Sequence, residues 1–263
     1  SSPAARKAAA ELGIDLFDAP PGTGPRGRIL SSDLKAASTA GTGSAIRRPM
    51  SRMRRAIAAN LQYSKQNIPH FYARIRLDAG PLIDFRKREK ASYDVSINDV
   101  VTFAVSRALA EFPPMRCRIE GGEIVETTSA NIGIAVGTED GLVVPVLENA
   151  DGMDLPALSA KTRGIVESAR GGRLAGQGKA VFTITNLGMF GLDEFTAIIN
   201  PGESGILSVG AIQEDVIVAE GKVRAGRAMT LVASADHRIV DGVIVAKFLA
   251  RLRELLENPD SIA

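Results

Sequence analysis

The chain has 263 residues and a formal net charge of +2, with 45% hydrophobic and 24% charged residues. These values are typical of a globular protein, so they exclude a disordered or fibrous chain, and the balanced charge gives no whole-chain case for nucleic-acid binding. One cysteine excludes an internal disulfide or a cysteine metal cluster, and no apolar run reaches the roughly 18 residues of a membrane span. The composition predicts a soluble, intracellular type of protein with two histidines to consider, His70 and His237.

Residues 1–36 predict a small all-α module. Ser2 and Pro3 favour the start of a helix that Gly13 ends, and a second short helix begins at Ser31-Ser32 after a loop rich in proline and glycine. A module with so few large apolar side chains lies below the length of roughly 40 residues at which domains usually fold unaided. We therefore expect it to dock onto a partner.

The loop between these two helices carries a glycine pattern and part of a basic cluster. Residues 22–27 fit G-x-G-x-x-G, but prolines rather than a strand precede them, so a dinucleotide site is not expected. Arg6, Lys7, Arg26 and Arg28 are predicted to gather on one face. The charge pattern alone fits an acidic protein partner and an ordinary solvated surface equally well.

Residues 37–46 have the small, polar composition of a flexible linker. Residues 47–263 are long enough for one large domain with a substantial core. Within it, helices are expected after the caps Ser51, Ser96 and Asp154, and a last helix after Gly242. Strand-like runs are expected at residues 70–77, 132–136, 142–147, 181–185, 206–209, 216–218 and 229–234, with hairpin turns at 121–122 and 139–141. This mixture, without regular strand–helix alternation, predicts an α+β fold around a mixed sheet.

The run from Asp236 to Gly242, Asp-His-Arg-Ile-Val-Asp-Gly, is the sharpest functional signal. It lies where a strand pattern ends and the last helix begins, so His237 is expected on a loop. Neutral imidazole accepts a proton near pH 7, which suits a general base. Asp241 follows closely enough to fix the turn. A lone histidine is more often a core residue bonded to a backbone carbonyl, but the whole run in this position favours the functional interpretation.

A second candidate is the run Thr183-Ile184-Thr185-Asn186-Leu187-Gly188, which places hydroxyl groups at a strand end before a loop. A hydroxyl there can donate a hydrogen bond to a developing oxyanion. The pattern alone also fits many ordinary strand ends. Spacing gives His70 no catalytic role, and Cys117 is interpreted as structural.

Taken together, these motifs resemble the dihydrolipoamide acyltransferase family of 2-oxo acid dehydrogenase complexes. Residues 1–36 resemble its peripheral-subunit-binding domain. Residues 47–263 resemble its catalytic domain through the ordered runs PMSRMRRAIAANL, IPHFY, INDVV, GLVVPV, ITNLGMFG, FTAIINPGESGILSVG and DHRIVDG. The run NLGMFG followed by FTAIINP is most similar to the pyruvate-type, acetyl-transferring branch. The resemblance implies a chloramphenicol-acetyltransferase-like α/β sandwich that forms trimers with active sites between subunits.

The resemblance also implies roles for individual residues. His237 matches the general base that takes the proton from the attacking thiol. Thr185 matches a position, usually serine, whose hydroxyl stabilises the oxyanion. Asp241, often asparagine in relatives, is expected to orient the loop, with Arg54 as its candidate partner. Gly242 is expected to allow a sharp turn into the last helix.

Substrates and partners follow from the same resemblance. It implies coenzyme A and a dihydrolipoamide arm as substrates and no metal, and Arg6, Lys7, Arg26 and Arg28 match or neighbour the family's docking residues. The docked partner is expected to be dihydrolipoamide dehydrogenase or the 2-oxo acid decarboxylase-dehydrogenase component, in bacterial cytoplasm or mitochondrial matrix. No lipoyl domain is visible, so it was removed or acts in trans. Residues 258–263 lack the bulky leucines of relatives, which puts a cubic or icosahedral core in question more than the trimer.

Three alternatives stay open at this point. The chain can be a non-catalytic scaffold paralogue of the same fold, although such scaffolds lack the motif histidine that His237 supplies. It can transfer a branched-chain or succinyl group instead of acetyl. A free-standing antibiotic acetyltransferase is a weaker alternative, because such an enzyme has no use for a docking module.

Overall fold

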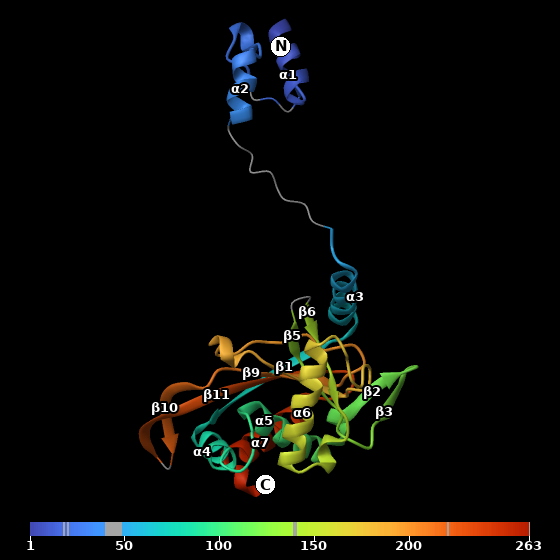
Figure 1. Cartoon of the computed structure of the whole chain (residues 1–263), viewed down its shortest axis with the longest axis vertical. Helices are drawn as coiled ribbons and strands as arrows, with labels where there is room; N and C mark the ends of the chain where they lie inside the picture. The colour runs from blue at the N-terminus through green and yellow to red at the C-terminus, as the bar shows by residue number, and fades with distance from the viewer. Residues whose placement is uncertain (18, 20, 40–48, 139–140, 220, 263) are drawn as a thin grey trace. The chain divides into compact units, whose positions relative to one another are not determined.

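The computed structural model describes residues 1–17, 19, 21–39, 49–138, 141–219 and 221–262 (Figure 1). The chain divides into two compact units, Ser1–Met50 and Ser51–Ala263, and each has its own apolar core. The predicted boundaries after residues 36 and 46 stay predictions, and residues 40–46 of the expected linker lie outside the described residues. No helix in the described part of the chain has the length and apolar character needed to cross a bilayer.

The small unit consists of two helices joined by a structured loop. The first helix begins at Ser2, whose hydroxyl accepts a hydrogen bond from the Ala5 amide at 3.1 Å, and ends at Gly13 in the left-handed conformation, as predicted. Buried Ala5, Ala9 and Leu34 form its core. The elements are α1 (Pro3–Leu12), the single turn η1 (Pro25–Gly27) and α2 (Ser31–Thr39).

Asp33 fastens the loop of the small unit. Its carboxylate accepts hydrogen bonds from the hydroxyl and amide of Thr23, at 2.6 and 3.0 Å, and from the amide of Leu30, at 2.9 Å. The hydrogen bond from the Thr23 hydroxyl contributes most to holding the pKa of Asp33 below its usual value, and the two backbone amides add to the effect. Gly22 lies so close to the backbone of Arg28 that a Cβ would be only 2.3 Å from its carbonyl carbon. The glycine pattern therefore serves a tight loop between two helices.

A seven-stranded mixed sheet forms the centre of the large unit (Figure 1). Its strand order is β1-β11-β9-β8-β4-β7, and β10 also pairs with β11. β8 runs parallel to β4 and β9, and the other pairs are antiparallel, which confirms the predicted α+β class with a mixed sheet. The strands are β1 (His70–Asp78), β4 (Ile132–Ile134), β7 (Val146–Leu147), β8 (Phe182–Asn186), β9 (Gly205–Val209), β10 (Gln213–Ala219) and β11 (Lys222–Asp236).

Two hairpins lie outside this sheet: β2 (Cys117–Glu120) with β3 (Glu123–Glu126), and β5 (Val136–Thr138) with β6 (Gly141–Val143). The turn at 121–122 is confirmed, and residues 139–140 of the second expected turn lie outside the described residues. The apolar runs 132–136 and 142–147 are each divided between a sheet strand and a hairpin strand. Pro145, which has no amide hydrogen for a strand ladder, lies at the second division.

Four helices pack around one face of the sheet. The helix α5 contacts the other three, and Phe182 of β8 lies edge-on to Phe248 of α7, with ring centroids 5.6 Å apart. Ser96 and Asp99 form the predicted capping box, and Asp154 caps as expected. The helices are α4 (Gly80–Glu89), α5 (Ile97–Glu111), α6 (Leu155–Arg170) and α7 (Gly242–Glu257), with the short turns η2 (Pro113–Arg116), η3 (Ala150–Gly152), η4 (Gly188–Phe190) and η5 (Pro259–Ser261).

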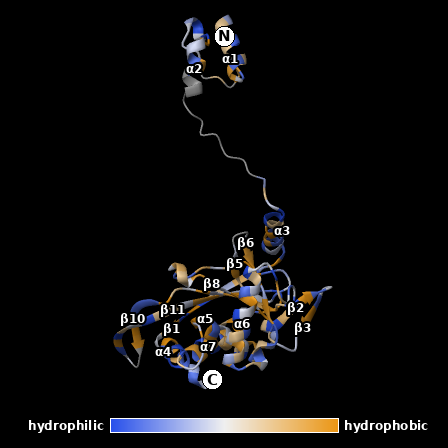
Figure 2. Ribbon diagram, viewed as in Figure 1, coloured by the Kyte–Doolittle hydropathy of each residue, from blue (hydrophilic) through white to orange (hydrophobic). Residues whose placement is uncertain are grey.

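The opposite face of the sheet is covered by residues 192–204, called the strap here. Side chains alternate along a strand, so Phe182 faces the helices and Thr183 faces the strap. The Asn200 amide donates to the Thr183 hydroxyl at 3.1 Å, and the Ser234 hydroxyl donates to the Ala197 carbonyl at 2.8 Å. The helix α3 (Arg52–Asn67) also contacts the strap. Most of its residues are exposed, and many of them are hydrophilic (Figure 2).

Candidate active site

His237 lies on the turn between β11 and α7, where the sequence predicted a loop. Its backbone amide donates to the carbonyl of Pro69 at 3.0 Å, and the carbonyl of Asp236 accepts from the amide of Ile239 at 2.9 Å. The imidazole is exposed and stands perpendicular to the ring of Phe71, with centroids 5.3 Å apart. Backbone hydrogen bonds thus fix the turn, while neither imidazole nitrogen has a hydrogen-bond partner among the described residues.

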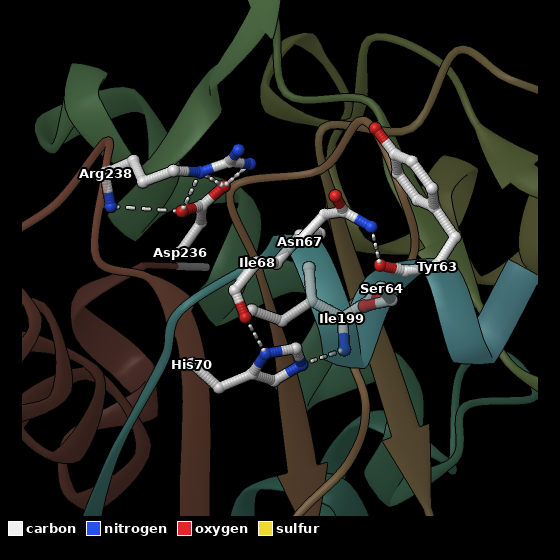
Figure 3. Close-up of polar contacts among 8 residues, drawn as sticks. All are labelled: Tyr63, Ser64, Asn67, Ile68, His70, Ile199, Asp236 and Arg238. Atoms are coloured by element: carbon white, nitrogen blue, oxygen red, sulfur yellow. Dashed lines mark hydrogen bonds and ion pairs between the residues drawn. The ribbon is translucent and has the colours of Figure 1, made fainter.

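Asp236 and Arg238 bracket His237 with an ion pair that the sequence analysis missed (Figure 3). Arg238 donates from Nη2 to one carboxylate oxygen at 2.6 Å and from Nε to both, at 3.0 and 3.2 Å, and its backbone amide donates at 3.0 Å. The Asp236 side chain is 2% exposed. These hydrogen bonds raise the pKa of the Arg238 guanidinium above its usual value. The pair thus joins the residues on either side of His237 across the turn.

Asp241 acts at the start of the following helix. Its carboxylate accepts a hydrogen bond from the amide of Ile244 at 2.9 Å and so caps α7. No described contact joins this carboxylate to His237 or to Arg54. The aspartate therefore fixes the end of the turn through the helix cap.

The structure gives a steric reason for a glycine at position 242. Its φ lies outside the left-handed region, so glycine is not needed here for a left-handed conformation, and the predicted sharp turn into the helix stays a prediction. A Cβ at this position would lie 3.2 Å from Cζ of Phe71. Glycine leaves room for that ring, and the same ring packs against His237. Glycine is favoured at this position because the Phe71 ring lies close to the Gly242 backbone.

Arg54 lies in the first turn of α3. Its amide donates to the hydroxyl of the cap residue Ser51 at 3.1 Å, as the sequence predicted for this helix start. The side chain is exposed and forms no ion pair with a described residue. The pairing of Arg54 with Asp241 stays a prediction.

Thr185 lies near the end of β8, on the face that the strap covers. It is 8% exposed and pairs in register with Ser208 of β9. Its hydroxyl makes no hydrogen bond to any residue that the structure describes. Beyond the strand, the Asn186 side chain accepts from the Gly188 amide at 2.9 Å, and the loop presents an exposed Phe190.

The register of the sheet separates Thr185 from His237. Thr185 pairs with Ser208, and Ser208 pairs with Val232 of β11. From Val232 the strand continues to Asp236, so the Cα atoms of Thr185 and Asp236 lie roughly 16 Å apart, given about 3.3 Å per residue and about 4.8 Å per strand. The two candidate side chains cannot meet within one copy of the chain.

His70 has both ring nitrogens occupied (Figure 3). The Ile199 amide donates to Nε2 at 3.1 Å, so Nδ1 carries the hydrogen and donates to the Ile68 carbonyl at 2.8 Å. The Ser64 hydroxyl donates to the carbonyl of the same Ile199 at 2.6 Å. These bonds clamp the strap at Ile199, which is fully buried. No ring nitrogen is left for proton transfer with a substrate.

The four predicted docking residues are all exposed on the small unit. Arg6 and Lys7 lie on α1, and Arg26 and Arg28 lie on the loop, where Arg26 adopts a left-handed φ of 59°. None of them forms an ion pair with a described residue. A hydrogen bond from the amide of Ser2 to the carbonyl of Ile29, 2.9 Å long, brings the start of α1 beside this loop.

The described residues contain no group of three or more His, Cys, Asp or Glu that could hold a metal ion. Cys117 is buried, and its burial raises the pKa of the thiol. Its sulfur lies 3.4 Å from the Pro113 carbonyl. These contacts agree with a structural cysteine.

Comparison with known proteins identifies the two parts of the chain. Residues 42–263 match the family described as 2-oxoacid dehydrogenases acyltransferase (catalytic domain), and residues 1–35 match the e3 binding domain. The dihydrolipoyllysine-residue acetyltransferase component of the pyruvate dehydrogenase complex of Rickettsia bellii is 36% identical over 258 residues, which cover 90% of this chain. The match spans 62% of that relative, less than two thirds of its length.

Two solved structures are similar along most of the large unit. They are the cubic core of a pyruvate dehydrogenase multienzyme complex and the dihydrolipoamide acetyltransferase of Azotobacter vinelandii. Each has a TM-score of 0.78 and 32% identity, and the match covers 84% of this chain and 95% of theirs. The resemblance found in the sequence is thereby confirmed, and the chain belongs to the 2-oxoacid dehydrogenase acyltransferase family.

Proposed function

We propose that the chain carries the acyl-transfer and partner-docking parts of a dihydrolipoamide acyltransferase, which moves an acyl group between dihydrolipoamide and coenzyme A. One observation carries the proposal: the exposed imidazole of His237 stands without a described hydrogen-bond partner on a turn that backbone bonds and the Asp236–Arg238 pair hold in place. Such a ring is free to accept a proton from a substrate. Membership of the acyltransferase family supports the same chemistry.

The reaction can be written with His237 as the general base. Its imidazole takes the proton of the coenzyme A thiol while the sulfur attacks the thioester carbon of acyl-dihydrolipoamide. A carbon–sulfur bond forms and the carbonyl oxygen becomes an oxyanion. When the tetrahedral intermediate collapses, the bond to the dihydrolipoamide sulfur breaks, and the imidazolium returns the proton to that sulfur. Proton transfer of this kind typically contributes about 10²–10⁴-fold to the rate.

Thr185 supplies the hydroxyl that donates to the oxyanion in this scheme. The Azotobacter vinelandii structure belongs to an investigation of a serine, a histidine and an asparagine in the catalytic mechanism of that enzyme. Their spacings along that chain equal those between Thr185, His237 and Asp241 here. The equal spacings support Thr185 and Asp241 as the counterparts of that serine and asparagine. Asp241 acts by capping α7 and fixing the turn, with Arg54 as its candidate partner.

The site is built from two copies of the chain in this proposal. Thr185 and the His237 turn lie too far apart within one copy for both to reach one thioester. The exposed loop after Thr185, with Met189 and Phe190, offers apolar surface for contact with a second copy. We propose that copies of the chain form the trimer that the family resemblance implies. Measurement of the assembled mass decides whether trimers join further into a cubic or icosahedral core.

The first experiment measures transfer from acetyl-coenzyme A to free dihydrolipoamide by the purified chain and by its His237→Ala variant. The parent is expected to be active, and the variant to be slower by at least about 10²-fold. Succinyl and branched-chain acyl donors are tested in parallel, and acetyl is expected to be the best substrate. A folded parent that is inactive with every donor would favour the non-catalytic scaffold and contradict the proposal.

A mixing experiment tests the shared site. The variants Thr185→Ala and His237→Ala are each expected to be slow when they assemble alone. When the two are co-expressed, some sites combine Thr185 of one copy with His237 of another, so activity is expected to return in part. No recovery in mixed assemblies would contradict a site that two copies share.

Docking belongs to the small unit in this proposal. The match to the e3 binding domain and the exposed basic residues Arg6, Lys7, Arg26 and Arg28 support dihydrolipoamide dehydrogenase as the partner, with the 2-oxo acid decarboxylase-dehydrogenase component as the other candidate. Arg28→Ala is expected to weaken binding of the partner and to leave acyl transfer to free dihydrolipoamide unchanged. Titration calorimetry with each partner checks the first part, and equal affinity of variant and parent would contradict it.

The proposal also includes the domain organisation, the source of the lipoyl arm and the cellular location. The organisation is residues 1–36 for docking, 37–46 for the linker and 47–263 for catalysis, close to the matched ranges 1–35 and 42–263. The lipoyl arm reaches the site from a lipoyl domain on the same or another polypeptide, and no metal takes part. Relatives come from bacteria and from mitochondria, which supports a place in bacterial cytoplasm or mitochondrial matrix.

A further inference from the structure

A hydroxyl group in the middle of the sheet has no evident structural use. Ser208 lies in β9 and is 1% exposed, and its hydroxyl has no hydrogen-bond partner among the described residues. Buried polar groups in proteins are nearly always hydrogen-bonded, because an unpaired one has lost its water without compensation. An unpaired buried hydroxyl therefore points to a partner that acts in another state of the protein.

Thr185 is the neighbour that can use this hydroxyl. The two residues pair in register on the parallel strands β8 and β9, so their side chains point to the same face of the sheet. The strands are about 4.8 Å apart, which brings the two hydroxyls within hydrogen-bond reach after rotation about χ1. On the other side, Ser208 pairs with Val232, whose apolar side chain offers no acceptor. The hydroxyl of Thr185 likewise makes no hydrogen bond to a described residue.

We propose that Ser208 is a positioning residue for Thr185, an inference that rests on the acyl transfer proposed above. The hydroxyl of Ser208 donates to Oγ1 of Thr185, so the single proton of Thr185 is left to point at the oxyanion of the substrate. A hydroxyl that accepts one hydrogen bond is also polarised and donates the next one more strongly. Ser208 is the more deeply buried of the two, at 1% exposed against 8%, so the substrate meets Thr185 first.

The test compares kinetics with stability in the variant Ser208→Ala. Since the oxyanion exists only beyond the ground state, kcat is expected to fall about three- to tenfold while KM for both substrates stays unchanged. Because the Ser208 hydroxyl is unpaired in the structure described here and bonds to Thr185 only when substrate is bound, its removal from the free protein is expected to leave the melting temperature equal or higher. A merely structural role predicts the reverse, a lower melting temperature at unchanged kcat.

Thr162 provides the matched control. It lies in α6, is buried, and also has a hydroxyl without a described partner, but it is not on the face that carries Thr185. Thr162→Val is expected to keep both kcat and the melting temperature of the parent. If the two variants slow the reaction equally, the effect belongs to buried hydroxyls in general, and the inference is overturned.

A double variant separates this inference from the proposed function. In a Thr185→Ala background, Ser208→Ala is expected to slow transfer no further, because it acts through Thr185. An equal loss in both backgrounds would overturn the inference. A slow Thr185→Ala together with a fully active Ser208→Ala would overturn it and leave the proposed function intact. A fully active Thr185→Ala would overturn both the inference and the oxyanion role on which it rests.

Discussion

The two histidines lie close together at one end of the sheet, yet their rings are held in opposite ways. His70 is the register partner of Asp236, the residue just before His237. Both nitrogens of the His70 ring are bonded to backbone groups, those of Ile68 and Ile199. The His237 ring has an aromatic edge contact and no hydrogen-bond partner in the described structure.

The fold holds the His70 residue through its ring and the His237 residue through its backbone. At His70 the main chain binds the ring, so the ring holds one tautomer and fixes the strap. At His237 the main chain and the Asp236–Arg238 pair bind the turn, and the ring stays available to a substrate. The histidine that supports the fold and the one proposed to act as general base thus differ in where their hydrogen bonds lie, on the ring for His70 and on the backbone for His237.

The largest effect is expected when the ring of His237 is removed. The variant His237→Ala is expected to lose about 10³-fold in acyl transfer. It should keep the melting temperature of the parent, because the ring makes no hydrogen bond to a described residue. Steady-state kinetics and thermal unfolding measured on the same sample check the two halves. A large fall in melting temperature would mean that His237 also supports the fold.

Glu203 is relevant to both histidines because neighbours of His70 and of His237 line the same cavity as its side chain. It lines a cavity of about 100 Å³ together with Ile68, Asp236 and Arg238. Its carboxylate accepts from the Asn200 side chain at 3.0 Å, and its other oxygen has no described partner. Burial raises the pKa of Glu203 to about 7.

The sign of the pH effect follows from this shift. Between the ordinary pKa of 4.5 and about 7, the unfolded chain loses the Glu203 proton while the folded chain keeps it, so stability falls as pH rises through this interval. Glu203→Gln removes the effect and is expected to stabilise the protein at pH 8 by up to about 3 kcal/mol, with little change at pH 4. Denaturant unfolding at both pH values checks this, and an equal gain at each pH would contradict it.

Removing the ring of His70 tests the supporting side of the comparison. His70→Ala leaves the buried amide of Ile199 without its acceptor, which is expected to cost about 1–3 kcal/mol of unfolding free energy. Transfer at low temperature should fall less than for His237→Ala. His70→Gln, which offers an acceptor and a donor, should recover part of the loss. Unchanged stability in His70→Ala would show that the clamp does not hold the strap.

The smallest effect is expected from Asp236→Asn, which keeps the shape of the side chain and removes its charge. The Arg238 guanidinium then loses its charged partner, and the turn that carries His237 becomes less ordered. We expect kcat to fall about tenfold, equal to about 1.4 kcal/mol, with KM nearly unchanged. The control is Asp94→Asn, which removes a carboxylate from the exposed Arg163 ion pair. Equal kcat for Asp236→Asn and the parent would contradict a role for the pair.

Features set by local hydrogen bonds were predictable from the sequence. The caps at Ser51, Ser96 and Asp154 bond to amides within the next turn, so the residue pattern contains the whole interaction. The His237 turn was also predictable, because its strand end, its histidine and its helix cap Asp241 lie in one short run. The helix α4 was not predicted, because the residues at its start, Gly80-Pro81, are typical of a turn.

Contacts between distant residues were not predictable. The bond between His70 and Ile199 joins residues that are far apart in the chain, and no local pattern marks Ile199 as its donor. The strand β11 begins at Lys222, earlier than expected. Its first half is polar and so was not predicted as a strand, but pairing with β10 holds it in the sheet. The Asp236–Arg238 pair is close in sequence, but two such side chains face each other only where the backbone turns.

The distance between Thr185 and His237 has a consequence for a newly made chain. In the proposed function, a folded single copy has its sheet, its strap and its turn in place but holds only the two separated halves of the reaction centre. In the proposed assembly, turnover then begins at association rather than at folding. In this proposal, dilution below the dissociation constant of the assembly inactivates the protein without unfolding it, and chains that have not yet associated do not react with thioesters in the cell.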